Sequence, residues 1–162
     1  MSGSHTRSQA GFDLTPPTPS QVEALAAHLD DEARRILLDH GTEPPFCGKL
    51  DEYEAEGTYG CALCGLPLFS SRAKFHSGSG WPSFYQGVDK DHIRNIVDSS
   101  HGMTRIEIRC GRCDSHLGHV FEDGPRPTGL RYCLNSVAMQ FTPEGEPLPD
   151  LLERDDPARI EG

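Results

Sequence analysis

The chain contains 162 residues, enough for one domain with a hydrophobic core and short tails. Its formal net charge of −10 argues against nucleic-acid binding, because that function requires a basic surface. Apolar residues make up only 35% of the chain, and 17 glycines and 13 prolines favour a loop-rich domain with mostly β structure. No apolar run approaches the roughly 18 residues of a membrane span, so we expect no membrane association.

Residues 1–19 are polar and contain Pro16, Pro17 and Pro19, which predicts a flexible N-terminal arm. This arm has no apolar core of the kind that a secretory signal needs. We therefore expect a cytoplasmic protein. In that compartment cysteines act more often as metal ligands or catalysts than as disulfide partners.

A helical segment is expected after the arm. Ser20 can cap a helix, with Glu23 three residues later completing a capping box. Gly41 ends the helical pattern, and Pro44 and Pro45 prevent its resumption. The segment predicts a helical hairpin or a bent helix that packs on the core. Its apolar residues recur at helical spacing in two sets: Val22, Leu25, Ala26 and Leu29, then Ala33, Ile36 and Leu37.

Three later stretches are typical of strands. The first, TYGCALCGLPLF (58–69), predicts a strand, a tight turn and a second strand, and MTRIEIRC (103–110) alternates cleanly. The third, GLRYCLNSVAMQF (129–141), predicts one strand with Cys133 and Asn135 on the same face. After Phe141 the chain is rich in proline and acidic residues. We therefore expect a single domain over residues 20–142 and a tail over 143–162.

Four of the six cysteines form two C-x-x-C pairs, Cys61 with Cys64 and Cys110 with Cys113. Four thiolates suit tetrahedral zinc, and a zinc ligated in this way is structural because no position is open to a substrate. The gap of about 45 residues between the pairs is longer than in a compact zinc ribbon, so the fold must bring two hairpins together. A redox dithiol or two disulfides are the alternatives. A redox C-x-x-C usually stands alone on a βα unit, and the sequence shows no such unit.

Cys133 and Cys47 belong to neither pair. Cys133 can be a small core residue, a disulfide partner or a nucleophile. Arg131 can favour its thiolate, and His116 and His119 can orient a thiol and transfer protons near neutral pH. A buried cysteine in a strand is more often packing than catalysis, so the residues alone leave this role open. Cys47 lies in a predicted loop, either as an incidental small residue or as an exposed thiol with a use.

Trp81 is the only tryptophan and lies in the loop SGSGWPSF (77–84), where a tryptophan more often forms a pocket wall or anchors the loop than belongs to a core. This loop is one of several motifs that resemble, in their order, the class B methionine-R-sulfoxide reductases. The resemblance runs from about Leu37 to Phe141 and leaves out the arm and the tail. The motifs are GTEPPF (41–46), CALCG-x-PLF (61–69), KF-x-SGSGWPSF (74–84), IEIRC-x-x-C (106–113) and SHLGHVFEDGP-x-PTGLRYCLNS (115–136).

The resemblance implies a mainly β fold in which two small antiparallel sheets pack together like a tent, with N-terminal helices and a zinc on four cysteines. It implies that the domain over residues 20–142 is catalytic. The activity would be that of a peptide-methionine (R)-S-oxide reductase, which uses a thiol to reduce methionine-R-sulfoxide in proteins. The family's site residues match the catalytic Cys133, the histidines His116 and His119, Asn135, and the substrate-binding Trp81, Phe121 and Arg131.

One position departs from the family pattern. Many members carry a resolving cysteine in the tryptophan loop, where this chain has Ser79, and serine cannot form a disulfide. Cys47 follows GTEPPF directly, where many relatives have threonine. We therefore expect Cys47 to resolve a Cys133 sulfenic acid as a disulfide that thioredoxin reduces. Direct reduction of the sulfenic acid by thioredoxin or a small thiol is the alternative.

The expected partners are oxidised proteins that carry methionine-R-sulfoxide, and thioredoxin as reductant. We expect a monomer. A non-catalytic zinc β module that binds a peptide is the alternative from another class, because a fold does not fix a function. Such a module would be free to lose the Cys133 thiol. A zinc ribbon for nucleic acid is disfavoured by the charge and by the scarcity of clustered lysine and arginine.

Overall fold

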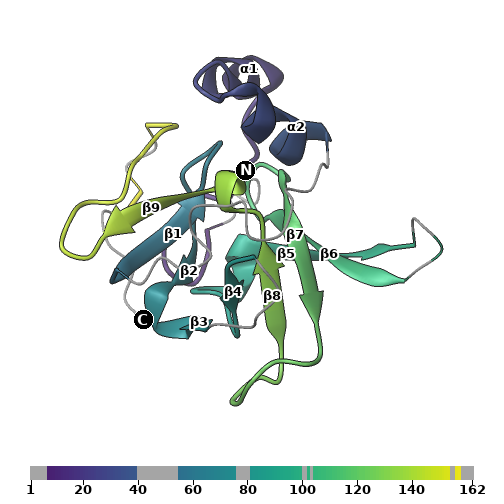
Figure 1. Ribbon diagram of the computed structural model, residues 1–162. Coiled ribbons are helices and arrows are strands. Elements are labelled where there is room, and N and C mark those ends of the chain that lie inside the picture. Colours follow the sequence, from purple (N-terminus) through teal and green to yellow (C-terminus); the bar gives the residue numbers. More distant parts are fainter. Residues whose placement is uncertain are drawn as a thin grey trace.

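The computed structural model of the protein describes residues 7–39, 55–75, 81–99, 102, 104–153 and 156–157. Two helices, α1 (Pro19–Ala26) and α2 (Asp31–Asp39), lie at one end of two antiparallel sheets (Figure 1). The mainly β fold expected from the resemblance is therefore confirmed. The strands are β1 (Gly57–Cys61), β2 (Pro67–Ser70), β3 (Lys74–Phe75), β4 (Ser83–Phe84), β5 (Ile93–Asp98), β6 (Arg105–Cys110), β7 (His116–Phe121), β8 (Arg131–Leu134) and β9 (Met139–Pro143), and the short 3-10 helices are η2 (Ser71–Ala73), η3 (Lys90–His92) and η5 (Ser136–Ala138).

The smaller sheet has the order β2-β1-β9, so β1 is its central strand. Tyr59 of β1 is fully buried and meets two rings edge-on, that of Phe141 on β9 at 5.1 Å and that of Phe84 on β4 at 5.0 Å. Phe69 of β2 stacks on the same Phe84 ring with the centroids 4.6 Å apart. Since Phe84 belongs to the larger sheet, these aromatic contacts pack the two sheets against each other.

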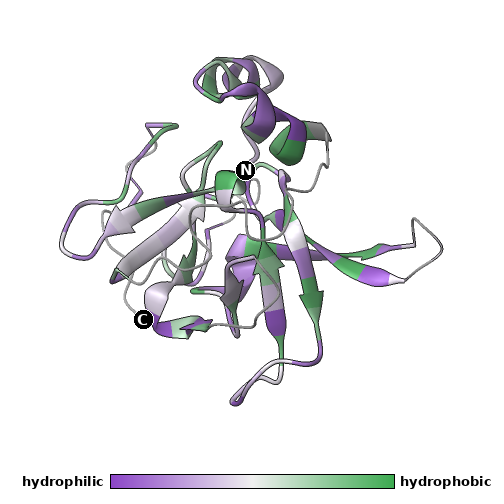
Figure 2. Ribbon diagram, in the orientation of Figure 1, coloured by the Kyte–Doolittle hydropathy of each residue, from purple (hydrophilic) through white to green (hydrophobic). Residues whose placement is uncertain are grey.

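The larger sheet has the order β3-β4-β8-β7-β6-β5. Strand β6 alternates as predicted: Ile108 is fully buried in the core, whereas Glu107 points to the opposite face. Strands β7 and β8 approach closely because Gly118 faces Leu134, and a Cβ atom on Gly118 would collide with the Cys133 carbonyl. Hydrophobic segments on β7 and β8 adjoin strongly hydrophilic ones (Figure 2), as expected where one face is core and the other carries polar groups.

The helical segment forms two helices with a break at residues 27–30, in agreement with a hairpin or bent helix. The predicted cap was wrong by two residues. Thr18 caps α1 and Gln21 completes the capping box, because Pro19 is favourable at the first helical position. Ile36 and Leu37 of α2 are buried, and α2 packs on β7. Among the described residues, no helix has the length and apolar character to cross a membrane.

The stretch GLRYCLNSVAMQF is not one strand, and this prediction was wrong. Strand β8 ends at Leu134, the turn η5 follows, and β9 continues in the other sheet. The break occurs at Asn135, whose backbone N–H and side-chain amide both donate to the carbonyl of Leu117, at 2.9 and 3.0 Å. Asn135 thus makes the last contact of β8 with β7, and its side-chain amide bonds to the same carbonyl before the chain turns away.

Residues 7–18, within the expected flexible arm, pack against the domain. Phe12 is 2% exposed and its ring meets that of His92 edge-on. His92 is fully buried, with Nε2 2.7 Å from the Ser8 hydroxyl and Nδ1 2.6 Å from the carbonyl oxygen of Pro67. Burial lowers the pKa of His92, even though the bond to Pro67 and the charge of Asp89 oppose this effect. The two apolar residues of "FDL" explain the packing, since Phe12 and Leu14 both enter the core.

Candidate active site and metal centre

Cys133 lies in the middle of the larger sheet. It pairs with His119 of β7 on one side and with Ser83 of β4 on the other. Its side chain is 9% exposed. Directly paired residues in a sheet point to the same face, so the thiol and the His119 ring share one surface. The sequence alone could not provide this pairing, because it depends on the register of β7 with β8.

The second predicted histidine lies on the same surface. The rings of His116 and His119 meet edge-on with their centroids 5.6 Å apart. His116 is 3% exposed, and its Nδ1 lies 2.7 Å from Oε2 of Glu107 on β6. Burial would raise the pKa of Glu107, but hydrogen bonds from Arg109 and His116 and the charges of both outweigh burial and lower it. An ionised Glu107 therefore fixes the His116 ring.

His119 has a different carboxylate partner. Its Nε2 lies 3.1 Å from Oδ2 of Asp98, the last residue of β5. Arg105 also reaches Oδ2 of Asp98, at 3.5 Å. The His119 side chain is 13% exposed and that of Asp98 20%, so this pair is nearer to solvent than the pair of His116 with Glu107.

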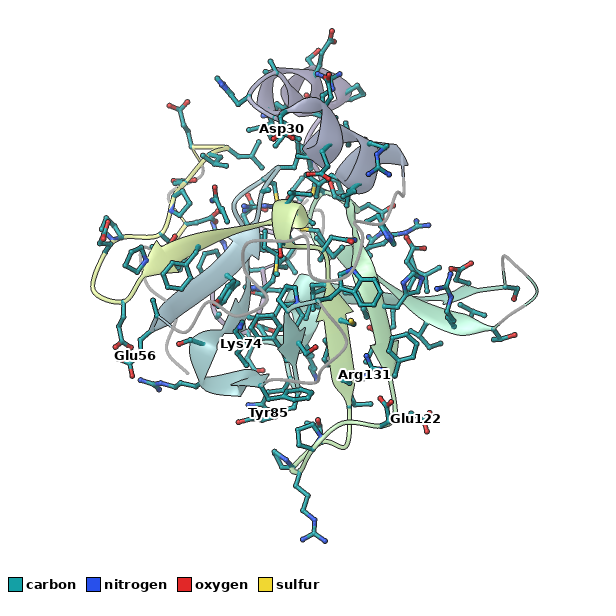
Figure 3. All side chains as sticks on the ribbon, viewed as in Figure 1. Asp30, Glu56, Lys74, Tyr85, Glu122 and Arg131 are labelled. Atoms are coloured by element: carbon teal, nitrogen blue, oxygen red, sulfur yellow. The ribbon has the colours of Figure 1, made fainter. Side chains whose placement is uncertain are left out.

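Arg131 and Phe121 form one side of the same surface. The guanidinium of Arg131 lies 4.5 Å from the centre of the Phe121 ring and donates to both carboxylate oxygens of Asp123, at 2.8 and 3.2 Å. The Asp123 bond raises the pKa of Arg131, burial opposes this, and the neighbouring Cys133 sulfur raises it further. Arg131 is therefore held beside Cys133 near the β7–β8 hairpin, where Figure 3 labels it close to Glu122.

Along the strands, Asn135 and Trp81 lie on the side of Cys133 that is opposite to Arg131 and Phe121. Asn135 is 3% exposed and its side-chain amide is fixed on Leu117, as described above. The carbonyl of Pro82 accepts the N–H of Leu134, which places the half-buried Trp81 beside Asn135 along the strands. The described predicted site residues therefore converge around Cys133. The remaining two positions of interest, Cys47 and Ser79, lie outside the described residues.

The other four cysteines form a cluster. The Sγ atoms of Cys61 and Cys113 are 3.6 Å apart, those of Cys64 and Cys110 are 3.5 Å apart, and all four lie within 4.8 Å of one another. These separations are far longer than a disulfide bond, and the pairs do not stand alone as a redox dithiol would. The prediction of one shared four-cysteine site is therefore confirmed as an arrangement that could hold a metal ion.

The two C-x-x-C turns, Cys61–Cys64 and Cys110–Cys113, have the same backbone conformation. Gly65 and Asp114 occupy corresponding positions, each just after the second cysteine of its pair, and both have positive φ, at 83° and 65°. Their N–H groups close the turns onto the carbonyls of Cys61 and Cys110. Glycine adopts this left-handed conformation without strain, and aspartate is among the residues that tolerate it.

The four-cysteine cluster is better suited to hold a cation than to remain as four free thiols. Hydrogen bonds to the neighbouring sulfurs, together with burial, raise the pKa of Cys61 well above its ordinary value. Burial raises the pKa of Cys64, but hydrogen bonds from the other thiols and the charge of Arg112 outweigh burial and lower it. Four thiolates in this space would repel one another, so a bound cation is needed to hold them all.

Arg112 lies between the two cysteines of the second C-x-x-C pair, Cys110 and Cys113, and is 2% exposed. Its guanidinium donates to the Cys64 carbonyl at 2.8 Å, to the Asp13 carbonyl at 3.1 Å and to Oδ2 of Asp156 at 2.7 Å. The side chain thus joins the cysteine cluster to a segment before the helices and a segment near the C-terminus. Asp156 lies in the expected tail, so this part of the tail packs on the domain.

Sequence reasoning missed four polar residues that support the site: Glu107, Asp98, Arg112 and Asp123. A weak indication for Glu107 was present in the sequence, because an acidic residue between Arg105 and Arg109 on one strand face is placed to form ion pairs. Asp98 and Arg112 gave no such signal. Their partners are distant in sequence and follow only from strand order and from the packing of the chain ends.

Comparison with known proteins identifies the family of the chain. Residues 29–143 match the family model of the SelR domain. A protein of Caulobacter vibrioides named peptide methionine sulfoxide reductase MsrB is 59% identical over 156 residues, 96% of this chain and 98% of the relative. A protein of Xylella fastidiosa with the same name is 63% identical over 145 residues, 90% of this chain and 94% of the relative. One from Escherichia coli, also so named, is 55% identical over 77% of this chain and 90% of its own length. The chain therefore belongs to the SelR domain family, and its resemblance to the class B methionine-R-sulfoxide reductases is confirmed.

Proposed function

We propose that this protein reduces methionine-R-sulfoxide in oxidised proteins to methionine, with Cys133 as the nucleophile. The main support is the pairing of Cys133 with His119 across β8 and β7, next to the guanidinium of Arg131. Among the described cysteines, Cys133 alone lies outside the four-cysteine cluster. Relatives that share more than half of the sequence carry the name of this activity.

The thiolate of Cys133 is the reactive form, and a neighbouring guanidinium favours it. The thiolate attacks the sulfur of the sulfoxide. That sulfur is a weak electrophile until its oxygen gains a proton, so a general acid must stand beside the thiol. His119 occupies this place, and His116 packs against it with its ring edge-on.

The oxygen then passes from the substrate to Cys133. The sulfur–sulfur bond made in the attack and the sulfur–oxygen bond of the sulfoxide both break, and an oxygen–sulfur bond forms on Cys133. The proton given to the oxygen stays on it, which yields a sulfenic acid. The substrate sulfur gains the electron pair that the cysteine sulfur loses, and methionine leaves. Trp81 and Phe121 would hold the S-methyl group on one side of the thiol. Such fixed orientation selects a single epimer of the sulfoxide.

We propose zinc as the ion of the four-cysteine cluster. Thiolate ligands in a tetrahedral set are typical of this metal, and when bound it would tie the turn after β1 to the turn after β6. A zinc on four thiolates has no open coordination position. The cluster would therefore stabilise the fold while Cys133 carries the chemistry.

The substitution Cys133→Ser tests the proposed nucleophile. We expect it to lower the turnover of dabsylated methionine-R-sulfoxide with dithiothreitol by about 1,000-fold or more, because a serine hydroxyl is a far weaker nucleophile than a thiolate and cannot become a sulfenic acid. The S epimer gives the matched control, since the wild-type protein should not reduce it. The variant should keep the wild-type melting temperature. Turnover that survives the substitution would refute the assignment of Cys133.

We further propose that Cys47 resolves the sulfenic acid as a disulfide and that thioredoxin reduces this disulfide. Such a cycle suits a cytoplasmic monomer, since thioredoxin keeps thiols reduced in that compartment. After one turnover without reductant, mass spectrometry should find a Cys47–Cys133 bridge, and Cys47→Ser should leave Cys133 as a sulfenic acid. A wild-type protein that retains the sulfenic acid and forms no bridge would exclude Cys47 as the resolving residue.

A further inference from the structure

We infer that Asp98 is a positioning residue, which fixes the ring of His119 so that one nitrogen carries its hydrogen away from Cys133 and the other serves the reaction. The inference rests on the proposed function and adds a residue to it. The observation behind it is the contact of His119 Nε2 with Oδ2 of Asp98 at 3.1 Å. An ionised carboxylate only accepts hydrogen bonds, so Nε2 must be the donor.

Strand order decides which way each ring nitrogen points. The sheet runs β8-β7-β6-β5, with Cys133 on β8, His119 on β7 and Asp98 on β5. Asp98 and Cys133 therefore lie on opposite sides of the His119 strand. Because Nε2 is directed toward β5, Nδ1 is the ring nitrogen left for the Cys133 side. The neutral ring is then the Nε2–H tautomer, whose Nδ1 can accept a proton and return it.

No other described carboxylate can serve His119 in the same way. Glu107 is its direct neighbour on β6, but Oε2 of Glu107 lies 2.7 Å from His116 and Oε1 lies 3.0 Å from Arg109. Asp98 reaches His119 from one strand further, at the end of the edge strand β5. Each histidine thus has its own carboxylate, and the one near solvent belongs to His119.

Asp98 is itself held by a second contact, since Arg105 reaches the same Oδ2 at 3.5 Å. The charged and titratable groups facing His119 are Asp98 from β5, Arg105 and Glu107 from β6, His116 from β7, and Arg131 and Cys133 from β8.

The test compares Asp98→Asn with Asp98→Glu in single turnovers that release methionine from a peptide methionine-R-sulfoxide, from about pH 5 to about pH 9. We expect Asp98→Asn to slow the step about 10- to 100-fold, because an amide can donate to Nε2 as well as accept from it and so no longer fixes one ring tautomer. Asp98→Glu should keep more of the wild-type rate, because it retains an accepting carboxylate. Glu144→Gln is the matched control, since Glu144 is an exposed carboxylate paired with Arg72 and follows β9 of the smaller sheet, outside the sheet that carries the site.

Two further measurements separate positioning from a structural effect. In a His119→Gln background, Asp98→Asn should change the rate less than about twofold, because the two residues act as one unit. Nitrogen NMR of the wild-type ring should show a hydrogen on Nε2 of neutral His119. A wild-type rate in Asp98→Asn, an undiminished effect in the His119→Gln background, or an Nδ1–H tautomer would each overturn the inference. The NMR result does not depend on activity, whereas a wild-type protein inactive on the R epimer would refute the proposed function instead.

Discussion

Cys64→Ser will lower the midpoint of thermal unfolding by about 10 °C or more and reduce bound metal well below one ion per chain. Cys64 is fully buried, and its Sγ lies within 4.8 Å of the three other cluster sulfurs. A structural zinc contributes folding free energy directly, and for a domain of this size about 1 kcal/mol corresponds to roughly 2–4 °C. Calorimetry together with metal analysis measures both quantities.

The matched control makes the same chemical change elsewhere. Cys133→Ser replaces another buried cysteine, but one outside the cluster. It should keep one metal ion per chain and melt within about 2 °C of the wild type, because the change removes no ligand of the cluster and alters a single atom. If Cys64→Ser also kept its metal and melted with the wild type, the cluster would not be a structural metal site.

Arg112→Met will destabilise the protein by about 3–5 kcal/mol, because it leaves the carboxylate of Asp156 buried without its cation. The ion pair is short, at 2.7 Å, and its side chains are only 1% and 3% exposed. Methionine fills much of the arginine volume, so the loss reports charge and hydrogen bonding more than packing. Urea unfolding of the variant measures the change in free energy.

Exposed Arg72 provides the comparison. It pairs with Glu144 at 3.7 Å, and its side chain is 71% exposed, so Arg72→Met should cost less than about 1 kcal/mol. A double-mutant cycle of Arg112→Met with Asp156→Asn should show a coupling of about 1 kcal/mol or more. Metal analysis of each variant separates the ion pair from loss of the ion. Equal costs for Arg112→Met and Arg72→Met would contradict the account of this buried pair.

The features that local patterns could predict are those whose causes are local. The C-x-x-C pairs, the alternation of β6 and the two helical sets of apolar residues all depend on near neighbours in sequence. The cap of α1 was misplaced because Ser20 and Thr18 are both good capping residues. Pro19 decides between them, since it belongs inside the helix rather than before it.

The features that were missed depend on contacts between distant residues. Asn135 ends β8 by bonding to Leu117, 18 residues away, and nothing in the local apolar pattern indicates that break. The carboxylate of Asp98 reaches His119 only because β5, β6 and β7 are neighbours in a particular register. The division into an arm, a domain and a tail stays a prediction. The described parts of both ends nonetheless meet at Arg112.

One stoichiometric measurement decides whether the Cys133 thiolate takes the oxygen of a methionine-R-sulfoxide. The reduced protein is mixed with an excess of a peptide carrying the R epimer, without any reductant, and the methionine released is counted. We expect one methionine per protein, with the oxidation located on Cys133, and none from the S epimer. Release of methionine by the Cys133→Ser variant, or none by the wild-type protein, would contradict this expectation.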